Sequence, residues 1–247
     1  MHPVPDFAAA RTFDAALDRL ADATQALGFD AVNYGYLPRA RAADGGYHAP
    51  TVVGRNFPRR WLRGWTPYLR EDPLIHASYP RTLPLDWKDV EGASWLMPIH
   101  RQAFDFIRVL GFGDGVTVPI HLPDNGFAFV TVAARAESGV WRTRKTEVLE
   151  RLLVIAHAFQ DSQASGSGPT SRVPRGSVLS AREQVVLACA AIGLNAPETA
   201  ERIHRSVETV RIQRKSAMRK LGAHTIAQAV ARAVNDGSIT VEDVLKK

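Results

Sequence analysis

The chain has 247 residues, of which 45% are apolar and 23% charged, and its net charge is +6. This is the composition of a globular protein, and the length allows one large domain or two smaller ones. No apolar run approaches the roughly 20 residues that a membrane span requires, and the N-terminus lacks a basic-then-apolar signal pattern, so we expect a cytoplasmic protein with no membrane partner. The single cysteine, Cys189, excludes a disulfide framework and a thiolate metal site within one chain.

The first two-thirds of the chain, residues 1–163, predict a mixed domain. Apolar residues recur at helical spacing in three segments: 11–28, 94–110 and 143–163. Aromatic and β-branched residues typical of strands fill four segments: 29–37, 52–53, 115–120 and 127–133. A Leu-Pro-Asp-Asn-Gly turn joins the last two strands as an antiparallel hairpin. We therefore expect an α+β fold, an α-β-α layered domain with a central antiparallel sheet.

A flexible linker is predicted at 164–177, where Ser, Gly and Pro dominate. Residues 171–247 hold 13 Lys and Arg against 7 Asp and Glu, whereas residues 1–170 hold 18 of each sign. All of the net charge therefore lies in the last third, where it can neutralise phosphates. This distribution favours a DNA-binding domain over residues 178–247.

Within that domain the residues predict an all-α unit of four helices. Ser180 followed by Glu183 is a capping-box pattern that begins the first helix, and Gly193 is suited to end it. A second helix starts after Asn195 or Ala196, since Pro197 fits a first turn. The three residues from 204 to 206 then form the turn of a helix-turn-helix.

The third helix begins at Ser206 and has two different faces. Its packing stripe holds Val210, Ala217 and Leu221, and its opposite side holds Arg211, Lys215 and Arg219. We expect the DNA contacts to come from Thr209, Arg211, Ile212, Lys215, Ser216 and Arg219, because the start and the basic face of this helix usually meet the major groove. A basic face that is merely solvated is the alternative.

These residues resemble the C-terminal domain of LuxR-type transcription regulators. The matching segments are 179–183, 206–210, 219–222 and 228–230, together with Leu187, Gly193, Ala200 and Ile203. The resemblance implies double-stranded DNA as a partner and a homodimer contact through a fourth helix at 225–236, with RNA polymerase as a further candidate partner. Arg214 and Ala217 depart from the family pattern. An arginine can lay its stem on the core and direct its head to a phosphate, so Arg214 is not expected to disable the domain.

The first domain resembles the autoinducer-binding domain of quorum-sensing LuxR proteins over roughly residues 10–160. The segments that carry the resemblance are 57–65, 72–73, Trp87 and 111–120. A response-regulator receiver is the alternative for such a domain, but its paired acids after a first strand are not found. The resemblance implies a small signal of the acyl-homoserine lactone class as ligand and no cofactor.

The same resemblance implies a role for each of several side chains. The Trp61 indole donates to the lactone carbonyl, and the Asp72 carboxylate accepts from the amide. Trp87 forms a wall beside the ring, Gly115 leaves room for it, and the Thr131 hydroxyl reaches the acyl carbonyl. Without the surrounding pattern, Trp87 is a core aromatic residue and Asp72 before a proline is a turn residue.

Two substitutions in this pattern bear on the acyl group. Phe57 and Trp65 each stand where the family usually has a tyrosine, so a hydroxyl is lost and a larger ring is gained. We expect a short, branched or aromatic acyl group, or a non-lactone signal. Histidines 76, 100 and 121 show no metal-ligand spacing, so no metal site is expected.

The expected function is a ligand-responsive transcription regulator that binds an inverted repeat as a dimer. A regulator of the same family that senses a plant-derived or other non-lactone compound is one alternative. An enzyme with an appended helix-turn-helix is another, but no nucleophile motif with a base occurs, so no enzyme is expected. A ligand-free interaction module with a collapsed pocket is the third.

Overall fold

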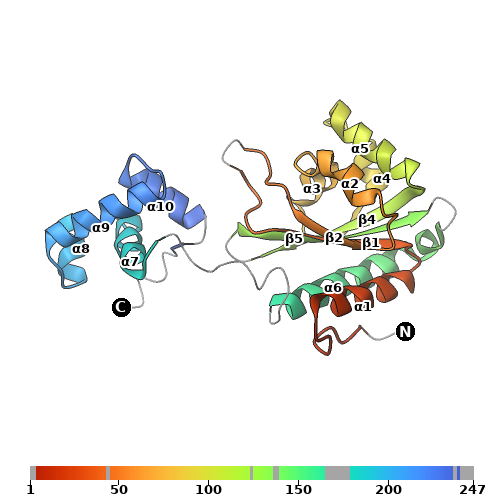
Figure 1. The fold of residues 1–247 in the computed structure, drawn as a ribbon, viewed down its shortest axis with the longest axis horizontal. Coiled ribbons are helices and arrows are strands. Elements are labelled where there is room, and N and C mark those ends of the chain that lie inside the picture. Colours follow the sequence, from red (N-terminus) through yellow and green to blue (C-terminus); the bar gives the residue numbers. More distant parts are fainter. Residues whose placement is uncertain are drawn as a thin grey trace. The chain divides into compact units, whose positions relative to one another are not determined.

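The structure is a computed structural model that describes six segments: 4–42, 45–122, 125–135, 139–164, 179–235 and 238–239. They form two compact units, one from the part of the chain up to 164 and the other mainly from residues 179 onward (Figure 1). Each unit is described by itself below. All but the first residue of the linker predicted at 164–177 lies outside the described residues. No helix in the described segments is both long and apolar enough to cross a bilayer.

The first unit is built on a five-stranded sheet in the order β2-β1-β5-β4-β3, with every neighbouring pair antiparallel. The strands are β1 Ala31–Leu37, β2 Thr51–Arg55, β3 Leu85–Asp86, β4 Phe112–His121 and β5 Phe127–Arg135. The predicted hairpin is therefore present, and its two strands are longer than expected. The two-residue strand β3 was missed because so short a segment carries no alternation.

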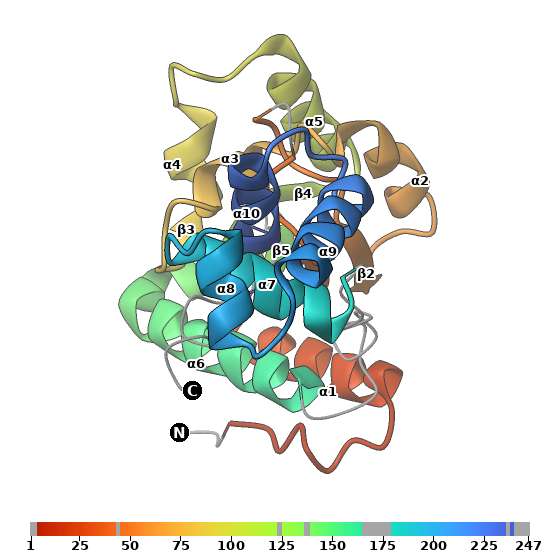
Figure 2. The ribbon, with the colours of Figure 1, turned by 90° about the vertical axis from the view of Figure 1, so that its left-hand side faces the viewer.

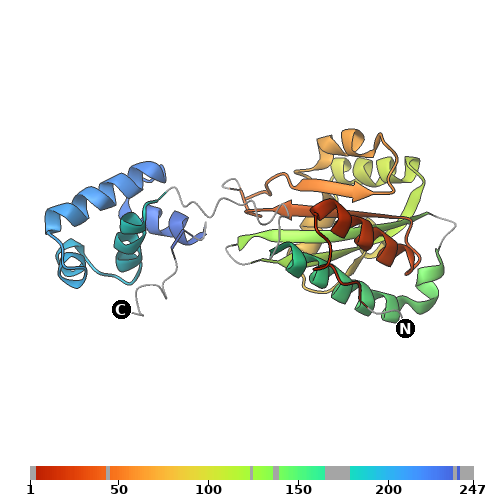
Figure 3. The ribbon, with the colours of Figure 1, turned by 60° about the horizontal axis from the view of Figure 1, so that its bottom comes forward.

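Helices cover both faces of the sheet. On one face lie α1 Phe13–Gln25 and α6 Lys145–Ala164, side by side in Figures 1 and 3. On the other face lie four shorter helices: α2 Trp61–Trp65, α3 Pro73–Ser78, α4 Trp87–Glu91 and α5 Pro98–Val109. Two 3-10 helices, Thr66–Tyr68 and Gly139–Arg144, also lie in the described part of this unit. The predicted α-β-α layering is confirmed.

The strand β1 shows how the two layers share the sheet. All seven of its residues are buried, because helices lie on both sides. Val32 and Tyr34 point into the core under α1 and α6. Ala31 belongs to the opposite cluster, and Asn33 faces the same side as Ala31 because side chains alternate along a strand. The α2–α5 side of the sheet is thus partly polar.

The helix predicted at 94–110 begins later, at Pro98. Proline is favoured in a first turn, and the preceding Met97 is extended and caps the helix. The helix predicted at 11–28 begins after Thr12, whose side chain accepts from the backbone of Ala15. Gly28 follows it with a φ of 96°, which glycine tolerates.

The second unit consists of four helices in the described segments (Figure 2): α7 Ala181–Ala191, α8 Ala196–Arg202, α9 Val207–Lys220 and α10 Ile226–Asn235. Ser180 and Glu183 form the predicted capping box, Asn195 caps α8, and Ser206 caps α9. Gly193 has a φ of 93° after α7, as expected for a helix end. The all-α four-helix fold is confirmed.

Candidate functional site

A small pocket lies between the sheet and the α2–α5 layer, and we call it the aromatic pocket. Its walls are Asn33, Val52, Phe57, Trp61, Trp65, Asp72, Leu74, Trp87, Ile107, Phe129 and Thr131. Six of the seven residues that the sequence placed at a ligand site are among these. The seventh, Gly115, lies against the Trp87 ring, where an added Cβ would come within 2.5 Å of a ring carbon. The lining residues come from three strands, β1, β2 and β5, and from all four helices of the α2–α5 layer.

The free space inside the aromatic pocket is small. Its cavity volume is about 20 Å³, which holds about one water molecule. Phe57 and Trp61 stack with ring centroids 4.2 Å apart and form one wall. An organic signal therefore requires these side chains to move apart.

Asp72 is the buried carboxylate of the pocket and also the N-cap of α3. It is 4% exposed, and its Oδ1 accepts from the backbone N–H of Leu74 at 2.8 Å. Burial raises the pKa of the Asp72 carboxyl to about 6. Hydrogen bonds from Leu74, Ile75 and Trp65 oppose that rise. Asp72 is therefore a capping residue that also lines the pocket.

Trp65 has a second role that its aromatic character did not predict. Its hydrogen bond to Asp72 comes from the indole N–H, the only polar hydrogen of the side chain. The ring therefore positions the carboxylate as well as narrowing the pocket.

A row of polar side chains crosses the floor of the pocket on three adjacent strands. Trp87 Nε1 donates to Thr117 Oγ1 at 3.3 Å, and the hydroxyls of Thr117 and Thr131 lie 3.0 Å apart. Asn33 is paired with Thr131 in the next strand. We call Asn33, Thr131 and Thr117 the polar row. It lies in an otherwise apolar floor.

Asn33 was not among the residues chosen from the sequence. Its Oδ1 is buried and has no hydrogen-bond partner within the described part of the chain. A buried amide oxygen without a partner is costly, so it marks a place where a donor fits. The sequence signal that could have identified Asn33 was the alternation of Ala31, Asn33 and Gly35 along β1. The apolar walls Val52, Leu74, Ile107 and Phe129 gave no such signal.

The second candidate site is the exposed side of α9. Arg211, Ile212, Lys215 and Arg219 are all exposed, and Ile212 is 60% exposed. We call Arg211, Lys215 and Arg219 the basic face. Thr209 lies in the first turn, where its hydroxyl is 2.8 Å from the Ser206 hydroxyl. These positions agree with a helix that presents its start and one side to DNA.

Ser216 is placed differently from its neighbours on α9. Its hydroxyl bonds to the Glu183 carboxylate, which also accepts from Lys220 at 2.7 Å. Burial of Glu183 opposes ionisation, but these bonds and those from Ser180 hold its pKa at about 2. Ser216 and Lys220 therefore fasten α9 to α7, so a DNA contact by Ser216 would compete with this bond.

The head group of Arg214 bonds within its own unit. Nη2 donates to the Leu194 carbonyl at 2.7 Å and to Thr199 Oγ1 at 3.1 Å, so this nitrogen is engaged by the protein. The side chain is half-buried, and burial lowers its pKa. Arg214 thus holds the start of α8 against α9, and the small Ala217 is fully buried beside this contact.

Family models match both units of the chain. The family described as "Autoinducer binding domain" matches residues 12–162, and "Bacterial regulatory proteins, luxR family" matches residues 177–233. The chain belongs to the autoinducer-binding LuxR family. The aromatic pocket lies in the first match and the basic face in the second.

This LuxR-family protein has relatives along most of its length. It is 28% identical over 193 residues to the transcriptional activator protein VanR of Vibrio anguillarum, covering 76% of this chain and 78% of VanR. It is 27% identical over 180 residues to the transcriptional activator protein RaiR of Rhizobium etli, covering 70% of this chain and 71% of RaiR. Both names describe transcription regulators.

Solved structures show the same fold. The LuxR-family chain aligns with Escherichia coli SdiA at a TM-score of 0.62 and 19% identity, covering 94% of this chain and 93% of SdiA. A structure of SdiA in complex with octanoyl-rac-glycerol aligns at a TM-score of 0.66 and 19% identity, covering 93% and 91%. At this identity the likeness concerns the fold alone.

Proposed function

We propose that this protein is a transcription regulator of quorum sensing that binds an acyl-homoserine lactone in the aromatic pocket and an inverted-repeat promoter site as a homodimer. The observation that carries the proposal is the buried Asp72 carboxylate facing a pocket that Trp61 also lines. A carboxylate accepts an amide N–H, and an indole N–H donates to a ring carbonyl. These are the two polar ends of such a signal.

The walls of the pocket bear on the acyl group. Phe57 offers no hydroxyl, Trp65 narrows the space, and the cavity is small before the side chains separate. We infer that a short, branched or aromatic acyl group fits better than a long straight chain. The polar row offers hydroxyls to the acyl carbonyl, and Thr131 is our candidate because it lines the pocket.

A regulator of a non-lactone signal is the second candidate. Phe57 lacks the hydroxyl that its family usually places there, and SdiA, which has the same fold, has been solved with octanoyl-rac-glycerol. A polar compound with a donor for Asp72 and an apolar body would satisfy the same walls. A plant-derived aromatic amide belongs to this class.

The basic face of α9 supports DNA as the second partner. We infer that the protein acts in the cytoplasm, where the DNA is, and that it is a regulator without enzymatic activity. VanR and RaiR are named transcriptional activators. If this protein also activates transcription, we expect it to contact RNA polymerase at the promoter.

The test is to express the full chain with a panel of lactones and of aromatic amides and to identify what co-purifies by mass spectrometry. We expect one intact compound in about one copy per chain, and the same compound should raise the melting temperature of purified protein. The Asp72→Ala variant should retain none. Recovery of a chemically altered compound would contradict the proposal in favour of an enzyme, and an intact non-lactone would favour the second candidate.

A further inference from the structure

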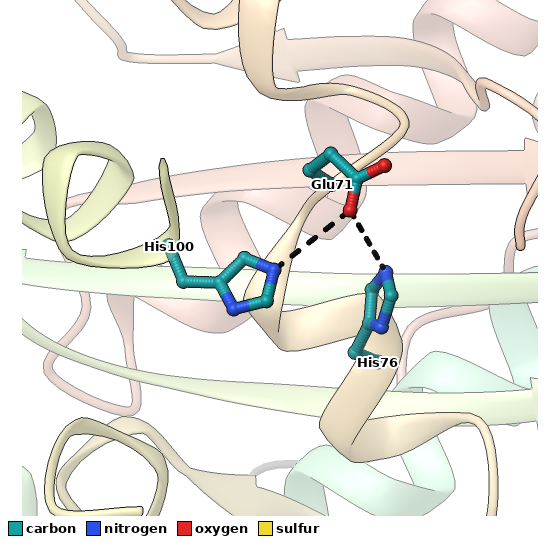
Figure 4. Close-up of side chains that lie close together, drawn as sticks. All are labelled: Glu71, His76 and His100. Atoms are coloured by element: carbon teal, nitrogen blue, oxygen red, sulfur yellow. Dashed lines mark ion pairs between the residues drawn. The ribbon is translucent and has the colours of Figure 1, made fainter. Parts of the chain in front are cut away.

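Two histidines that lie far apart in the sequence meet one glutamate beside the aromatic pocket (Figure 4). Glu71 Oε2 lies 3.9 Å from His76 Nε2 and 3.9 Å from His100 Nε2. The three ligand atoms all lie within 4.8 Å of one another. We call these residues the histidine cluster. Their spacing in the sequence did not predict it, because His76 lies on α3 and His100 on α5.

Both imidazole Nε2 atoms are buried and lack a hydrogen-bond partner among the residues that the structure describes. His100 is 1% exposed, so no water reaches this atom to replace a partner. Trp95 packs with its ring 5.4 Å from His100, and Tyr47 lies 4.7 Å from His76. Two buried nitrogen atoms without solvent contact therefore point at one carboxylate, and aromatic rings pack around both imidazoles.

We propose that Glu71, His76 and His100 bind a divalent transition-metal ion of the zinc class. A point equidistant from three atoms with these separations lies about 2.5 Å from each, and bonds from Zn²⁺ to imidazole nitrogen and carboxylate oxygen are about 2.0–2.2 Å. Each ligand atom would have to move toward the ion by less than about 0.5 Å to reach these bond lengths. The Glu71 side chain is 47% exposed and has room to make that movement.

The donor set selects the class of ion. Two imidazoles and one carboxylate suit Zn²⁺, Co²⁺ or Ni²⁺, whereas Ca²⁺ and Mg²⁺ prefer sites made only of oxygen. Three ligands leave one tetrahedral position for water at the exposed side of Glu71. Glu71 supplies the negative charge of the site. Arg41, which lies over the Tyr47 ring, is a nearby positive charge that opposes the ion.

The two imidazoles differ in how ready they are to bind. His76 bonds to the backbone of Arg70 through its other nitrogen, since Nε2 is unpaired. A backbone carbonyl can only accept, so that nitrogen is protonated and Nε2 has a free lone pair, as in many metal sites. His100 Nδ1 accepts from the Met97 N–H at 3.1 Å, so its proton lies on Nε2.

Metal binding therefore moves the His100 proton. The Nε2 proton is released as the metal bond forms, Nδ1 takes up a proton, and the bond from Met97 breaks. The Met97 N–H and the new Nδ1–H then face each other without an acceptor, which weakens affinity by roughly ten- to a hundredfold. The bonds from three ligands to the ion can outweigh this cost. The exchange also predicts a signature, because the proton of His100 changes from one ring nitrogen to the other.

The position of the cluster gives the ion a structural effect. His76 lies four residues after Asp72 on α3, and His100 lies on α5, which also carries the pocket residue Ile107. An ion would join two of the helices that line the aromatic pocket, α3 and α5. This inference does not depend on the identity of the signal.

The experiment titrates Zn²⁺ and Co²⁺ into untagged, chelator-treated full-length protein, without any signal. We expect one Zn²⁺ per chain with a dissociation constant of about 1 μM or lower, and visible absorption bands of four- or five-coordinate Co²⁺. His76→Gln and Glu71→Gln should each weaken binding by at least about tenfold. His157→Gln, which changes an exposed histidine on α6, is the matched control and should bind as the parent does.

Unfolding is a separate concern for His100→Gln, since His100 is buried and caps α5. His76→Gln and Glu71→Gln avoid it because both side chains are partly exposed, and circular dichroism verifies the fold. Nitrogen NMR of the parent protein adds a readout that needs no variant: the His100 proton should move to Nδ1 when Zn²⁺ is added. Equal affinity in the parent and in His76→Gln, or a parent dissociation constant above about 1 mM, would overturn the proposal.

Discussion

The Asp72 carboxylate both caps a helix and lines the aromatic pocket. As a cap it accepts from the backbone of Leu74, and as a pocket group it is held by the Trp65 indole. Burial disfavours the ionised carboxylate and so raises the pKa of Asp72. At the scale of single residues, the chemistry of the pocket is therefore sensitive to proton concentration close to neutrality.

We predict that affinity for the signal falls as pH falls through 6. The ionised carboxylate is the better acceptor for an amide N–H, and with a pKa of about 6 it is fully ionised at pH 7.5. At pH 5 about a tenth remains ionised, so affinity should drop roughly tenfold. Calorimetry between pH 5 and 7.5 measures this. Asp72→Asn keeps the cap but has no charge, so its weaker binding should not vary with pH. If this variant showed the same pH dependence as the parent protein, the assignment to Asp72 would be wrong.

Asn33 leads to a prediction about the acyl group. We expect Asn33→Leu to weaken binding of a signal with a second polar group on its acyl chain, such as a 3-hydroxyl, by about 1–3 kcal/mol, because a buried hydrogen bond is lost. Affinity for the unsubstituted signal should stay the same or rise, since the unpaired Oδ1 is removed. Binding measurements with the two signals decide it. Equal losses for both would show that Asn33 serves packing only.

At the scale of elements, α9 has two opposed surfaces. Val210 and Ala217 are fully buried, while Lys215 and Arg219 are exposed. The helical period allowed both surfaces to be predicted from the sequence. It did not show that Arg214 and Ser216, which lie between the two surfaces, bond to neighbouring helices.

The basic face should contribute to the salt dependence of DNA binding. Each phosphate contact releases counterions, so Lys215→Gln and Arg219→Gln should each lower the slope of log affinity against log salt by about 1. Fluorescence anisotropy with a promoter fragment at several salt concentrations measures this. Arg101→Gln, an exposed arginine on α5 of the other unit, is the control and should leave the slope unchanged. If neither α9 variant changes the slope, another surface meets the phosphates.

The Glu183 contact between α7 and α9 gives a prediction about stability. The folded pKa of about 2 lies below the ordinary value of 4.5, so the carboxylate stabilises the fold above pH 4.5 and this contribution is lost as pH falls toward 2. Glu183→Gln should therefore cost about 1–3 kcal/mol at pH 7. Hydrogen exchange of the α7 amides measures the loss. The difference between variant and parent should shrink near pH 2, and a difference that persists there would contradict the ionic origin.

At the scale of the whole molecule, charge and ligand chemistry are divided between two units. The pocket lies in the neutral part of the chain and the basic face in the part that holds the net charge. Such a division suits a regulator in which one unit senses and the other binds DNA. The sequence shows this division directly, because it needs only a count of charges along the chain.

The proposed dimer predicts a spacing rule for the DNA. Two copies of α9 should bind half-sites about one helical turn apart. Insertion of 5 base pairs between the half-sites places them on opposite sides of the duplex, so affinity should fall by at least tenfold. Insertion of 10 base pairs returns the half-sites to the same side of the duplex and should restore part of the affinity. Gel-shift assays with the three sites test this, and equal binding to all three would show that the copies bind independently.

Local patterns in the sequence determined much of this protein. The capping box at Ser180, the helix-ending glycines, the two faces of α9 and the hairpin each depend on residues close together in the chain. Interactions over a few residues are set by backbone geometry and side-chain period, so a sequence shows them directly. The helices of the helix-turn-helix were predicted in this way, whereas the six predicted walls of the aromatic pocket came from the resemblance to the autoinducer-binding domain.

Only the tertiary structure decided which distant residues meet. The polar row joins β1, β4 and β5, the histidine cluster joins α3 and α5, and Arg214 reaches the start of α8. Strand register and helix packing set these encounters, and both depend on the burial of apolar surface summed over the whole domain. No single residue carries that sum, which is why Asn33 and the histidine cluster became visible only in the folded chain.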